Sequence, residues 1–345
     1  MDGDMGVQLL AYWLDQIVGD PPNRWHPVAW QGRFLAWAER HAPASEGRSQ
    51  GSGVRDQGAA DSEMARFAWG ASSLLAGMSL SAAAAWGVMR LARCLPWPLR
   101  LLLEAGLLKL TLASHGLDRA AGEVEAALRR GDLPEARRLL SWHLVSRDTS
   151  DLSAEEVAGA AAESVAENLT DAFVAPLCAY AAGGLPAVWA YRFAQTADSM
   201  WGYHDAAHEW LGKPAARLDD ALNWLPARLA AGLLTLAAAS CGEDAANAWR
   251  TRRSQAGNTA SPNAGQTMAA MAGALGVTLT KRGHYALAGG AAAVTPDALA
   301  RGRRITRVAA GLAVAAATIV VAVRWASRAR HFASAWHVGQ RRGRG

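Results

Sequence analysis

Two stretches of this 345-residue chain are longer and more apolar than the helices of an ordinary soluble domain. Residues 67–89 and residues 172–191, which are 23 and 20 residues long, contain no charged side chain, and both are bounded by charged residues. At about 1.5 Å per residue, a helix of either length crosses a hydrocarbon core of roughly 30 Å. A third uncharged run, residues 308–323, is also bounded by charges. These three runs predict membrane spans.

Three further apolar segments, residues 7–18, 95–113 and 225–241, are shorter or interrupted by charge. Tryptophan is frequent, with 15 Trp against 5 Tyr and 5 Phe, and many Trp lie near segment ends, as in the aromatic belts of membrane proteins. We therefore expect an all-α, multi-pass integral membrane protein with helical cytoplasmic loops, with three spans and one to three additional ones. The alternative is a soluble all-α protein with buried Ala- and Leu-rich helices.

Charge and cysteine content exclude several other classes of protein. The formal net charge is +5, and no Lys/Arg run is interleaved with aromatic residues, so we expect no nucleic-acid partner. Cys94, Cys178 and Cys241 are far apart and odd in number, which argues against a disulfide scaffold. The acidic residues Asp2 and Asp4 stand where a signal peptide has a basic region, so we expect no signal peptide.

The segments between the apolar runs differ from one another. Residues 42–66 are rich in Ala, Gly, Ser, Gln and charge, which predicts a flexible loop. Residues 113–170 have helical periodicity and predict a water-facing helical hairpin. Within it, Asp132 is a candidate N-cap, and Ser153 with Glu156 forms a candidate capping box. No convincing strand pattern is present, so we expect only helix and loop.

One acidic constellation precedes the second predicted span. Glu163 and Glu167 are four residues apart and share a helix face, with Asp171 one turn further along. Like charges stacked in this way cost stability unless a cation lies between them, and Mg²⁺ held by one or two carboxylates and phosphate oxygens would supply it. The alternative is a solvated acidic face.

A second constellation precedes the apolar segment 225–241. Asp219 shares a helix face with Asn223, and Asp220 is within reach of the same amide. Arg217 and Arg228 could pair with these acids or bind phosphate in a bidentate manner. The alternative is a structural network of ion pairs.

Two turn-forming stretches could also contribute. Asp15 lies inside an apolar segment, where an unpaired carboxylate is costly, and it is followed by a Gly-Asp-Pro-Pro turn and by His26 before a proline. Residues 261–265, Ser-Pro-Asn-Ala-Gly, form a polar turn whose amides and hydroxyl could receive an anion. No P-loop, dinucleotide fingerprint, nucleophile elbow or zinc-protease motif occurs, so any use of ATP lies outside the standard motifs.

Six stretches, taken in order, carry a specific likeness. They are Asp15 with residues 19–22 and 26–28; residues 144–150; residues 163–168 with Asp171 and residues 175–177; residues 198–203; residues 216–229; and residues 261–265 with residues 271–276. Together they resemble the CobD/CbiB family, the adenosylcobinamide-phosphate synthases of cobalamin biosynthesis. The likeness covers about residues 7–290, and we treat residues 1–330 as a single membrane-embedded domain followed by a basic C-terminal tail at residues 331–345.

This resemblance implies a reaction and its setting. Members of the family join adenosylcobyric acid to (R)-1-amino-2-propanol or its O-phosphate, with ATP as co-substrate and Mg²⁺ as cofactor, to give adenosylcobinamide or its phosphate. It implies an amide-forming ligase in the cell inner membrane with its active face in the cytoplasm. Its partners would be the corrinoid, the amino alcohol and membrane lipid, and a homo-oligomer or contact with other enzymes of the pathway is compatible with it.

The resemblance also implies site residues at the matching positions. The implied catalytic residues are Glu163, Glu167, Asp219, Asp220, Arg217 and His26, where a carboxylate or His26 accepts the proton of the amine. The implied co-substrate-binding residues are Arg147, Asp148, Asn168, Asp198, Tyr203, Asn223, Arg228, Ser261 and Asn263. The implied Mg²⁺ ligands are Glu167, Asp171 and Asp219. His204 and Gln266 depart from the family, which usually has Arg or Lys and Trp there.

Two other functions remain open at the level of sequence. A membrane transporter would place charged residues deep inside its spans, facing a pathway. Here only Asp15, Arg228 and the charges of residues 95–113 lie within apolar stretches, and most acids lie near the ends of spans, which favours an enzyme. A non-catalytic membrane sensor on a related fold would not require the motif acids and arginines together.

Overall fold

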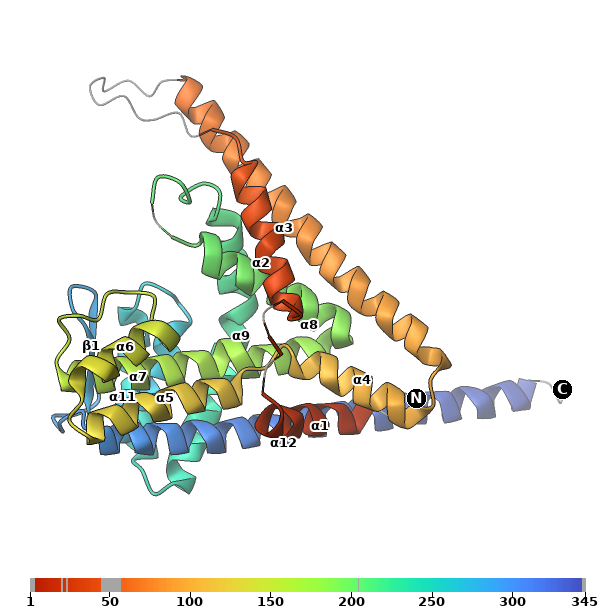
Figure 1. Ribbon diagram of the computed structural model, residues 1–345. Helices are drawn as coiled ribbons and strands as arrows, with labels where there is room; N and C mark the ends of the chain where they lie inside the picture. The colour runs from red at the N-terminus through yellow and green to blue at the C-terminus, as the bar shows by residue number, and fades with distance from the viewer. Residues whose placement is uncertain (1–3, 20, 23, 45–56, 204, 343–345) are drawn as a thin grey trace.

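The computed structural model describes residues 4–19, 21–22, 24–44, 57–203 and 205–342, which are almost entirely helical (Figure 1). The helices and strands, in chain order, are α1 (Asp4–Ile17), α2 (Pro27–Arg40), α3 (Gln57–Leu91), η1 (Ala92–Cys94), α4 (Trp97–Lys109), α5 (Ser114–Arg129), α6 (Leu133–His143), α7 (Ala154–Leu169), η2 (Thr170–Val174), α8 (Ala175–Trp201), α9 (Lys213–Ser240), α10 (Ala245–Gln255), η3 (Ala256–Asn258), α11 (Ala264–Leu275), β1 (Thr278–Lys281), β2 (Tyr285–Ala288) and α12 (Pro296–Arg342).

Four helical segments are long and apolar enough to cross a membrane. Each of the three uncharged runs lies inside one of them, and the fourth contains residues 225–240 of the apolar segment 225–241. The other two apolar segments form α1 and α4, which have 14 and 13 residues and fall short of the roughly 20 that a span requires. The expectation of an all-α, multi-pass membrane protein is confirmed. The four segments are Ala60–Cys94, Ala154–Trp201, Lys213–Ser240 and Pro296–Val323.

Two helix starts follow directly from local sequence. The Asp132 side chain accepts a hydrogen bond from the Glu135 backbone N at 3.1 Å and caps α6. Ser153 and Glu156 form both hydrogen bonds of the capping box at the start of α7, at 3.2 and 2.8 Å. Both predicted caps are confirmed, because each depends only on residues within one turn.

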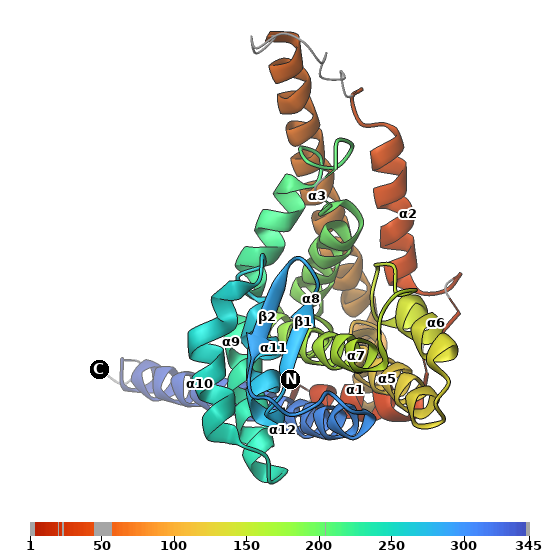
Figure 2. The same cartoon turned by 90° about the vertical axis from the view of Figure 1, so that its left-hand side faces the viewer.

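The expectation of no strand is wrong. β1 and β2 form an antiparallel hairpin in which Lys281 pairs with Tyr285. Each strand has only four residues, too few for an alternating pattern to stand out, and Gly283, with φ of +73°, forms the turn. The hairpin lies against α7 and α11 (Figure 2), and Leu279 and Leu287 are buried there.

The predicted flexible loop is shorter than expected. α3 begins at Gln57, so the last part of residues 42–66 is helical, while residues 45–56 lie outside the described residues. At the other end of the chain, the backbone of α12 stays helical through the predicted tail as far as Arg342, and residues 343–345 lie outside the described residues.

The helical segment that carries Glu163 and Glu167 is interrupted twice. Thr170–Val174 forms a π-helical turn between α7 and α8. Further along, Gly183 and Gly184 leave helical geometry, and Gly184 has φ of +67°, a value that glycine adopts without strain. The first break lies at Asp171 and changes the helical register there. The second break allows one long apolar segment to change direction.

The two halves of α8 accordingly belong to two hydrophobic clusters. Residues before and just after the glycine break, such as Leu177 and Val188, lie in the larger core with α1, α4–α7 and α9–α12. Phe193 and Trp201 lie instead in a smaller cluster with residues of α2, α3 and the start of α9. In Figure 1, α3 extends obliquely away from the larger core, with α2 beside it.

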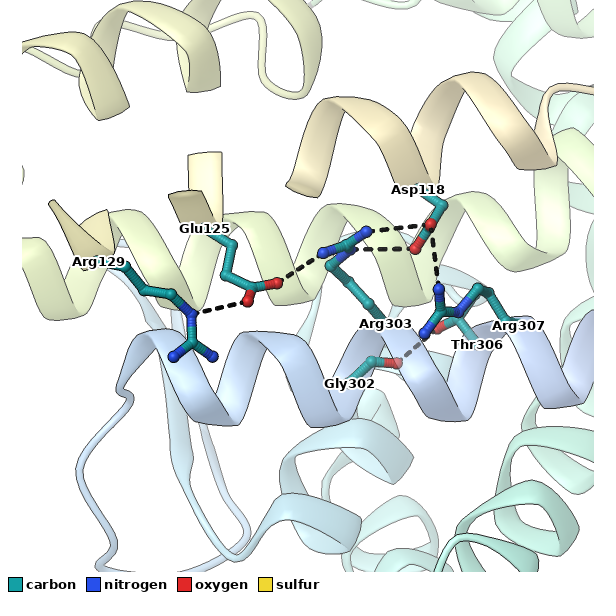
Figure 3. A network of polar contacts seen from close by, with 7 residues as sticks. All are labelled: Asp118, Glu125, Arg129, Gly302, Arg303, Thr306 and Arg307. Atoms are coloured by element: carbon teal, nitrogen blue, oxygen red, sulfur yellow. Dashed lines mark hydrogen bonds and ion pairs between the residues drawn. The ribbon is translucent and has the colours of Figure 1, made fainter. Parts of the chain in front are cut away.

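Charged residues connect the helices of the larger core. The buried Asp15 of α1 accepts a hydrogen bond from the His115 backbone N at 3.0 Å, so it caps α5 from another helix. Figure 3 shows Arg303 of α12 between Asp118 and Glu125 of α5, at 3.0 and 2.6 Å. Arg303 and Arg307, which precede the apolar run of α12, thus form ion pairs that fix α5 on α12. Arg301 and Arg304 instead pair with Glu243, between α9 and α10.

Candidate functional site

The acidic row of α7 and η2 lies in the interior of the protein. Glu163 is 5% exposed, and its Oε1 atom has no hydrogen-bond partner among the described residues. α7 is buried almost all round because it is rich in alanine and packs closely. A solvated acidic face, the alternative open at the level of sequence, is therefore excluded for Glu163. A buried carboxylate oxygen without a partner is costly, so this position favours a cation or a protonated ligand.

The cations nearest to this row come from distant segments. Arg147, from the loop after α6, acts electrostatically on Glu163, and Lys281 of β1 acts on both Glu163 and Glu167. Tyr285, opposite Lys281 in the hairpin, faces the same two carboxylates. Burial, and then the negative charges of Glu163 and Glu167, raise the pKa of Tyr285 well above its usual value, so its hydroxyl keeps its proton at any physiological pH. Sequence reasoning missed Lys281 and Tyr285 because it missed the hairpin.

The second constellation is joined to the first through Tyr191 of α8. The Asn223 Nδ2 atom donates to Asp219 Oδ2 at 2.9 Å, and the Tyr191 hydroxyl donates to Asn223 Oδ1 at 2.9 Å. The same hydroxyl lies 3.4 Å from the backbone oxygen of Asp171. Asp219 Oδ1 is buried and has no hydrogen-bond partner among the described residues. The network therefore holds one oxygen of Asp219 and leaves the other for a ligand.

The acids of α8 and α9 are close enough to interact. Asp171 interacts electrostatically with Asp219, Glu167 and Asp198. Asp198 in turn interacts with Asp220. Carboxylates from α7, η2, α8 and α9 thus form one continuous acidic region, although they are spread over more than fifty residues of the chain.

Two hollows open beside this region and share Tyr203. The larger has a volume of about 580 Å³ and is lined by residues 141–146 on one side and Asp198 on the other. The smaller has a volume of about 210 Å³ and is lined by Arg217 and Asp220. Together they give the acidic region access to ligands from two sides of the α8 C-terminus.

The turn before α11 closes the region on the side of α9. The Asn263 Nδ2 atom donates to the backbone oxygen of Asp220 at 2.8 Å, and Ser261 Oγ lies 3.5 Å from the Asp220 carboxylate. Arg228 Nη1 donates to Asn263 Oδ1 at 3.4 Å. The structure thus brings Asp220, Arg228, Ser261 and Asn263 together, although the sequence patterns alone placed them in two separate groups.

Three predicted site residues have local roles in this structure. Asp148 accepts hydrogen bonds from the backbone N and hydroxyl of Ser150, and these lower the pKa of its carboxyl. The Asn168 Nδ2 atom donates to the Ser164 backbone oxygen at 2.9 Å. His26 is the N-cap of α2, where its Nδ1 accepts from the Val28 backbone N at 3.2 Å.

The donor set suits Mg²⁺ only if a ligand completes it. Among the described residues, no group of three or more His, Cys, Asp or Glu side chains is arranged to hold a metal ion on its own. Mg²⁺ commonly takes one or two carboxylates from the protein and the remaining oxygens from phosphate and water. The unpartnered oxygen of Asp219 and the neighbouring Glu167 and Asp171 fit that role, because all are hard oxygen donors in one acidic region.

Comparisons with protein-family models and with curated relatives point to the same family. A family model described as CobD/Cbib protein matches residues 8–310. The chain belongs to the CobD/CbiB family. All members of the acidic region, the turn before α11 and the hairpin lie inside the matched range. No solved structure matches the chain.

Curated members of the family cover most of the chain. The cobalamin biosynthesis protein CobD of Dehalococcoides mccartyi is 39% identical over 281 residues, which is 81% of this chain and 85% of the relative. CobD of Chromobacterium violaceum is 41% identical over 277 residues, 80% of this chain and 81% of the relative. CbiB of Salmonella typhimurium is 37% identical over 281 residues, 80% of this chain and 82% of the relative.

Proposed function

We propose that this protein acts in cobalamin biosynthesis as a ligase of the inner membrane. It joins the free carboxylate of adenosylcobyric acid to (R)-1-amino-2-propanol or its O-phosphate, with ATP and Mg²⁺, on the cytoplasmic face. The observation that carries the proposal is the convergence of carboxylates from α7, η2, α8 and α9 beside two hollows, within a chain of the CobD/CbiB family.

The chemistry requires an activated acid. The corrinoid carboxylate oxygen attacks the γ-phosphorus of ATP, the bond to the bridging oxygen breaks, and ADP leaves. The amine then attacks the acyl carbon, phosphate leaves, and the amine loses one proton. Both steps build up negative charge on oxygen, which cations and hydrogen-bond donors stabilise.

The residues of the chain divide these tasks. One or two of the carboxylates of Glu167, Asp171 and Asp219 would hold Mg²⁺ together with phosphate oxygens, and the ion would neutralise charge on the triphosphate. Arg147 and Arg217, at opposite sides of the region, would contact phosphate or the oxyanion. Tyr203, shared by both hollows, would contact a ligand in either one.

The structure favours a carboxylate over His26 as the proton acceptor. The Nδ1 atom of His26 already accepts a hydrogen bond from the Val28 backbone, so protonation there would remove the cap of α2. Glu163 has a buried oxygen without a partner, and Tyr285 supplies a hydroxyl beside it. We therefore assign Glu163 as the group that accepts the proton of the amine.

An add-back assay tests the proposal. Membranes that contain the protein are incubated with adenosylcobyric acid, aminopropanol phosphate and Mg-ATP, and the amide product is measured by mass spectrometry. Glu167→Gln and Asp219→Asn should each lower product formation at least about a hundredfold, or roughly 3 kcal/mol, while the protein still inserts into the membrane. Glu135→Gln, an exposed carboxylate on α6, is the matched control and should retain full activity.

The assay also separates the alternatives. Full activity in both variants would remove Glu167 and Asp219 from the catalytic residues. No amide product from the unaltered protein, together with uptake of a solute into vesicles, would replace the ligase with a transporter. Binding of a corrinoid without product or transport would favour a sensor.

A further inference from the structure

Two arginines from neighbouring helices meet at the first turn of α11. Arg228 of α9 donates to Asn263, the N-cap residue of α11, at 3.4 Å. Arg252 of α10 donates through Nε to Gln266 Oε1 at 3.0 Å, and Gln266 lies three residues after Asn263. Both guanidinium groups are therefore fixed at the same helix end.

Each arginine is also held by a tryptophan of its own helix. The Arg228 guanidinium lies 4.1 Å from the ring centroid of Trp224, and that of Arg252 lies 4.7 Å from the ring centroid of Trp249. Both tryptophans are about half exposed, so the pair is at the protein surface. Stacking on a ring face immobilises a guanidinium and leaves its in-plane N–H groups for a planar or tetrahedral anion.

The charge around these two arginines is not compensated by the chain. Within the described ranges, neither Arg228 nor Arg252 forms an ion pair with a carboxylate, whereas Arg303 contacts two. Burial, and then the positive charges of Arg228 and Arg253, lower the pKa of Arg252. Like charges held together in this way cost free energy until an anion joins them.

The helix end adds to the same field. α11 has 12 residues and no acidic residue in its first turn, so its N-terminus carries the positive end of the helix dipole. The nearest acid, Asp220, accepts from Asn263 through its backbone oxygen and lies 3.5 Å from Ser261 through its carboxylate. Positive charge from three sources thus converges on one point of the surface.

We propose that Arg228 and Arg252, with the first turn of α11, form a phosphate-binding site. Two guanidinium groups and a helix N-terminus match the geometry of a phosphate ester or a diphosphate. The phosphate comes from a soluble ester or from an anionic lipid headgroup, since α9 also exposes Leu225 and Leu229 beside Trp224. The proposal rests on the proposed function, because Arg228 and Asn263 are among the residues that the family resemblance implies for co-substrate binding. Its ligand is measured by binding without turnover, so failure of this site and failure of the ligase are distinguishable.

The first test measures a soluble phosphate. The full-length protein in neutral detergent is titrated with pyrophosphate by isothermal calorimetry. Arg252→Gln should weaken binding about tenfold, since a charge-assisted hydrogen-bond pair contributes roughly 1.5 kcal/mol or more. Arg250→Gln is the control, because it removes one charge from the same helix. Arg250 is exposed and donates a hydrogen bond to the Ala246 backbone oxygen of its own helix, so its replacement should leave binding unchanged.

The second test measures a lipid. The same variants are reconstituted in nanodiscs of phosphatidylcholine with phosphatidylglycerol, and retained anionic lipid is counted by native mass spectrometry. If Arg252→Gln alone weakens pyrophosphate binding in the calorimetry, the ligand of the site is a soluble phosphate. If Arg252→Gln alone retains less anionic lipid in the nanodiscs, the ligand is a lipid headgroup. Equal binding by Arg252→Gln and the unaltered protein in both measurements would overturn the proposal.

A conservative variant guards against misfolding. Arg252→Lys keeps the charge but loses the planar fork, so it should fold and bind about threefold more weakly. If Arg252→Gln fails to fold, Arg252→Lys and Arg250→Lys are compared in the same assays. Equal affinities for that pair would also overturn the proposal.

Discussion

The two longest uncharged runs of the sequence have different surroundings in the folded protein. Of the apolar window of Ala60–Cys94, which contains most of α3, 17% is buried inside the protein, against 56% for Ala154–Trp201, which contains α7 and α8. α3 therefore presents most of its apolar surface outward, and α7–α8 forms the interior against which the acidic region is built. Absence of charge predicts a helix in both places, but it does not say whether lipid or protein surrounds that helix.

Introducing a charge should separate the two environments most strongly. Leu80, near the middle of the α3 segment, is 64% exposed. If it faces lipid, Leu80→Arg should cost roughly 3 kcal/mol and lower membrane insertion about a hundredfold in a glycosylation-mapping assay. Trp142→Arg is the control, because Trp142 is 76% exposed on α6, outside the candidate spans. Equal insertion of Leu80→Arg and the unaltered chain would show that α3 faces water.

The contact between the two segments should be sensitive to a side chain added at Gly77. A Cβ atom at Gly77 of α3 would lie 1.9 Å from the Phe193 ring of α8, whereas a Cβ at Gly87 would meet nothing within 4 Å. Gly77→Val should lower stability by about 2 kcal/mol by overpacking, read as a fall in the Tm of the detergent-solubilised protein. Gly87→Val is the matched control, and equal Tm values for the two variants would contradict this α3–α8 contact.

Within the interior segment, loss of one hydroxyl should affect the site without affecting the fold. Tyr191→Phe removes the hydrogen bond to Asn223 and thereby loosens Asp219. We expect kcat in the amide assay to fall about tenfold, or roughly 1.4 kcal/mol, with little change in Tm. Tyr203→Phe alters a hydroxyl that lines the hollows, so it should change KM more than kcat. Unchanged kcat in Tyr191→Phe would separate the network from catalysis.

The smallest effect concerns the ion pairs of His208, in the loop between α8 and α9. His208 contacts Asp205 at 2.8 Å and Glu39 of α2 at 3.2 Å. Burial lowers the pKa of His208, but hydrogen bonds to both carboxylates outweigh it and raise that pKa above its usual value. The stabilisation is therefore full below about pH 6.5 and is lost as the pH rises through the folded-state value.

His208→Gln should accordingly lower stability by about 0.5 kcal/mol at pH 6 and by almost nothing at pH 9. Thermal unfolding at the two pH values measures the difference. His284→Gln, on the turn of the hairpin, is the control, since no ion pair to its side chain occurs in the described ranges. A constant difference between His208→Gln and the unaltered protein at both pH values would exclude the ion pairs as its cause.

Local sequence was sufficient for part of this structure. The caps at Asp132 and Ser153 and the helix that carries Glu163 and Glu167 were predictable, because each depends on residues within a turn or two. The grouping of Asp220 with Ser261 was predictable only through the family resemblance.

The remaining features depend on tertiary contacts that leave little trace in the sequence. Tyr191 lies in an uncharged run and reads as an ordinary core residue until Asn223 is placed against it. Lys281 and Tyr285 belong to strands too short to recognise. Arg252 reads as one of several exposed charges on a polar helix until α11 brings Gln266 beside it. In all three cases the role of the side chain depends on which residue lies against it in the folded protein, and the periodicity of the sequence does not encode that contact.

Because of the π-helical turn at Thr170–Val174, the alignment of side chains along this helical segment depends on its exact number of residues. A π turn holds one residue more than an α turn, so deletion of a single codon there would leave a regular and well-formed helix. It would also rotate every later side chain by about 100° relative to the earlier ones. Helical content would survive such a deletion, while Glu163 and Glu167 of α7 lost their alignment with Asp198 of α8. In this segment, deletions that preserve the reading frame should therefore be as damaging as loss of a carboxylate.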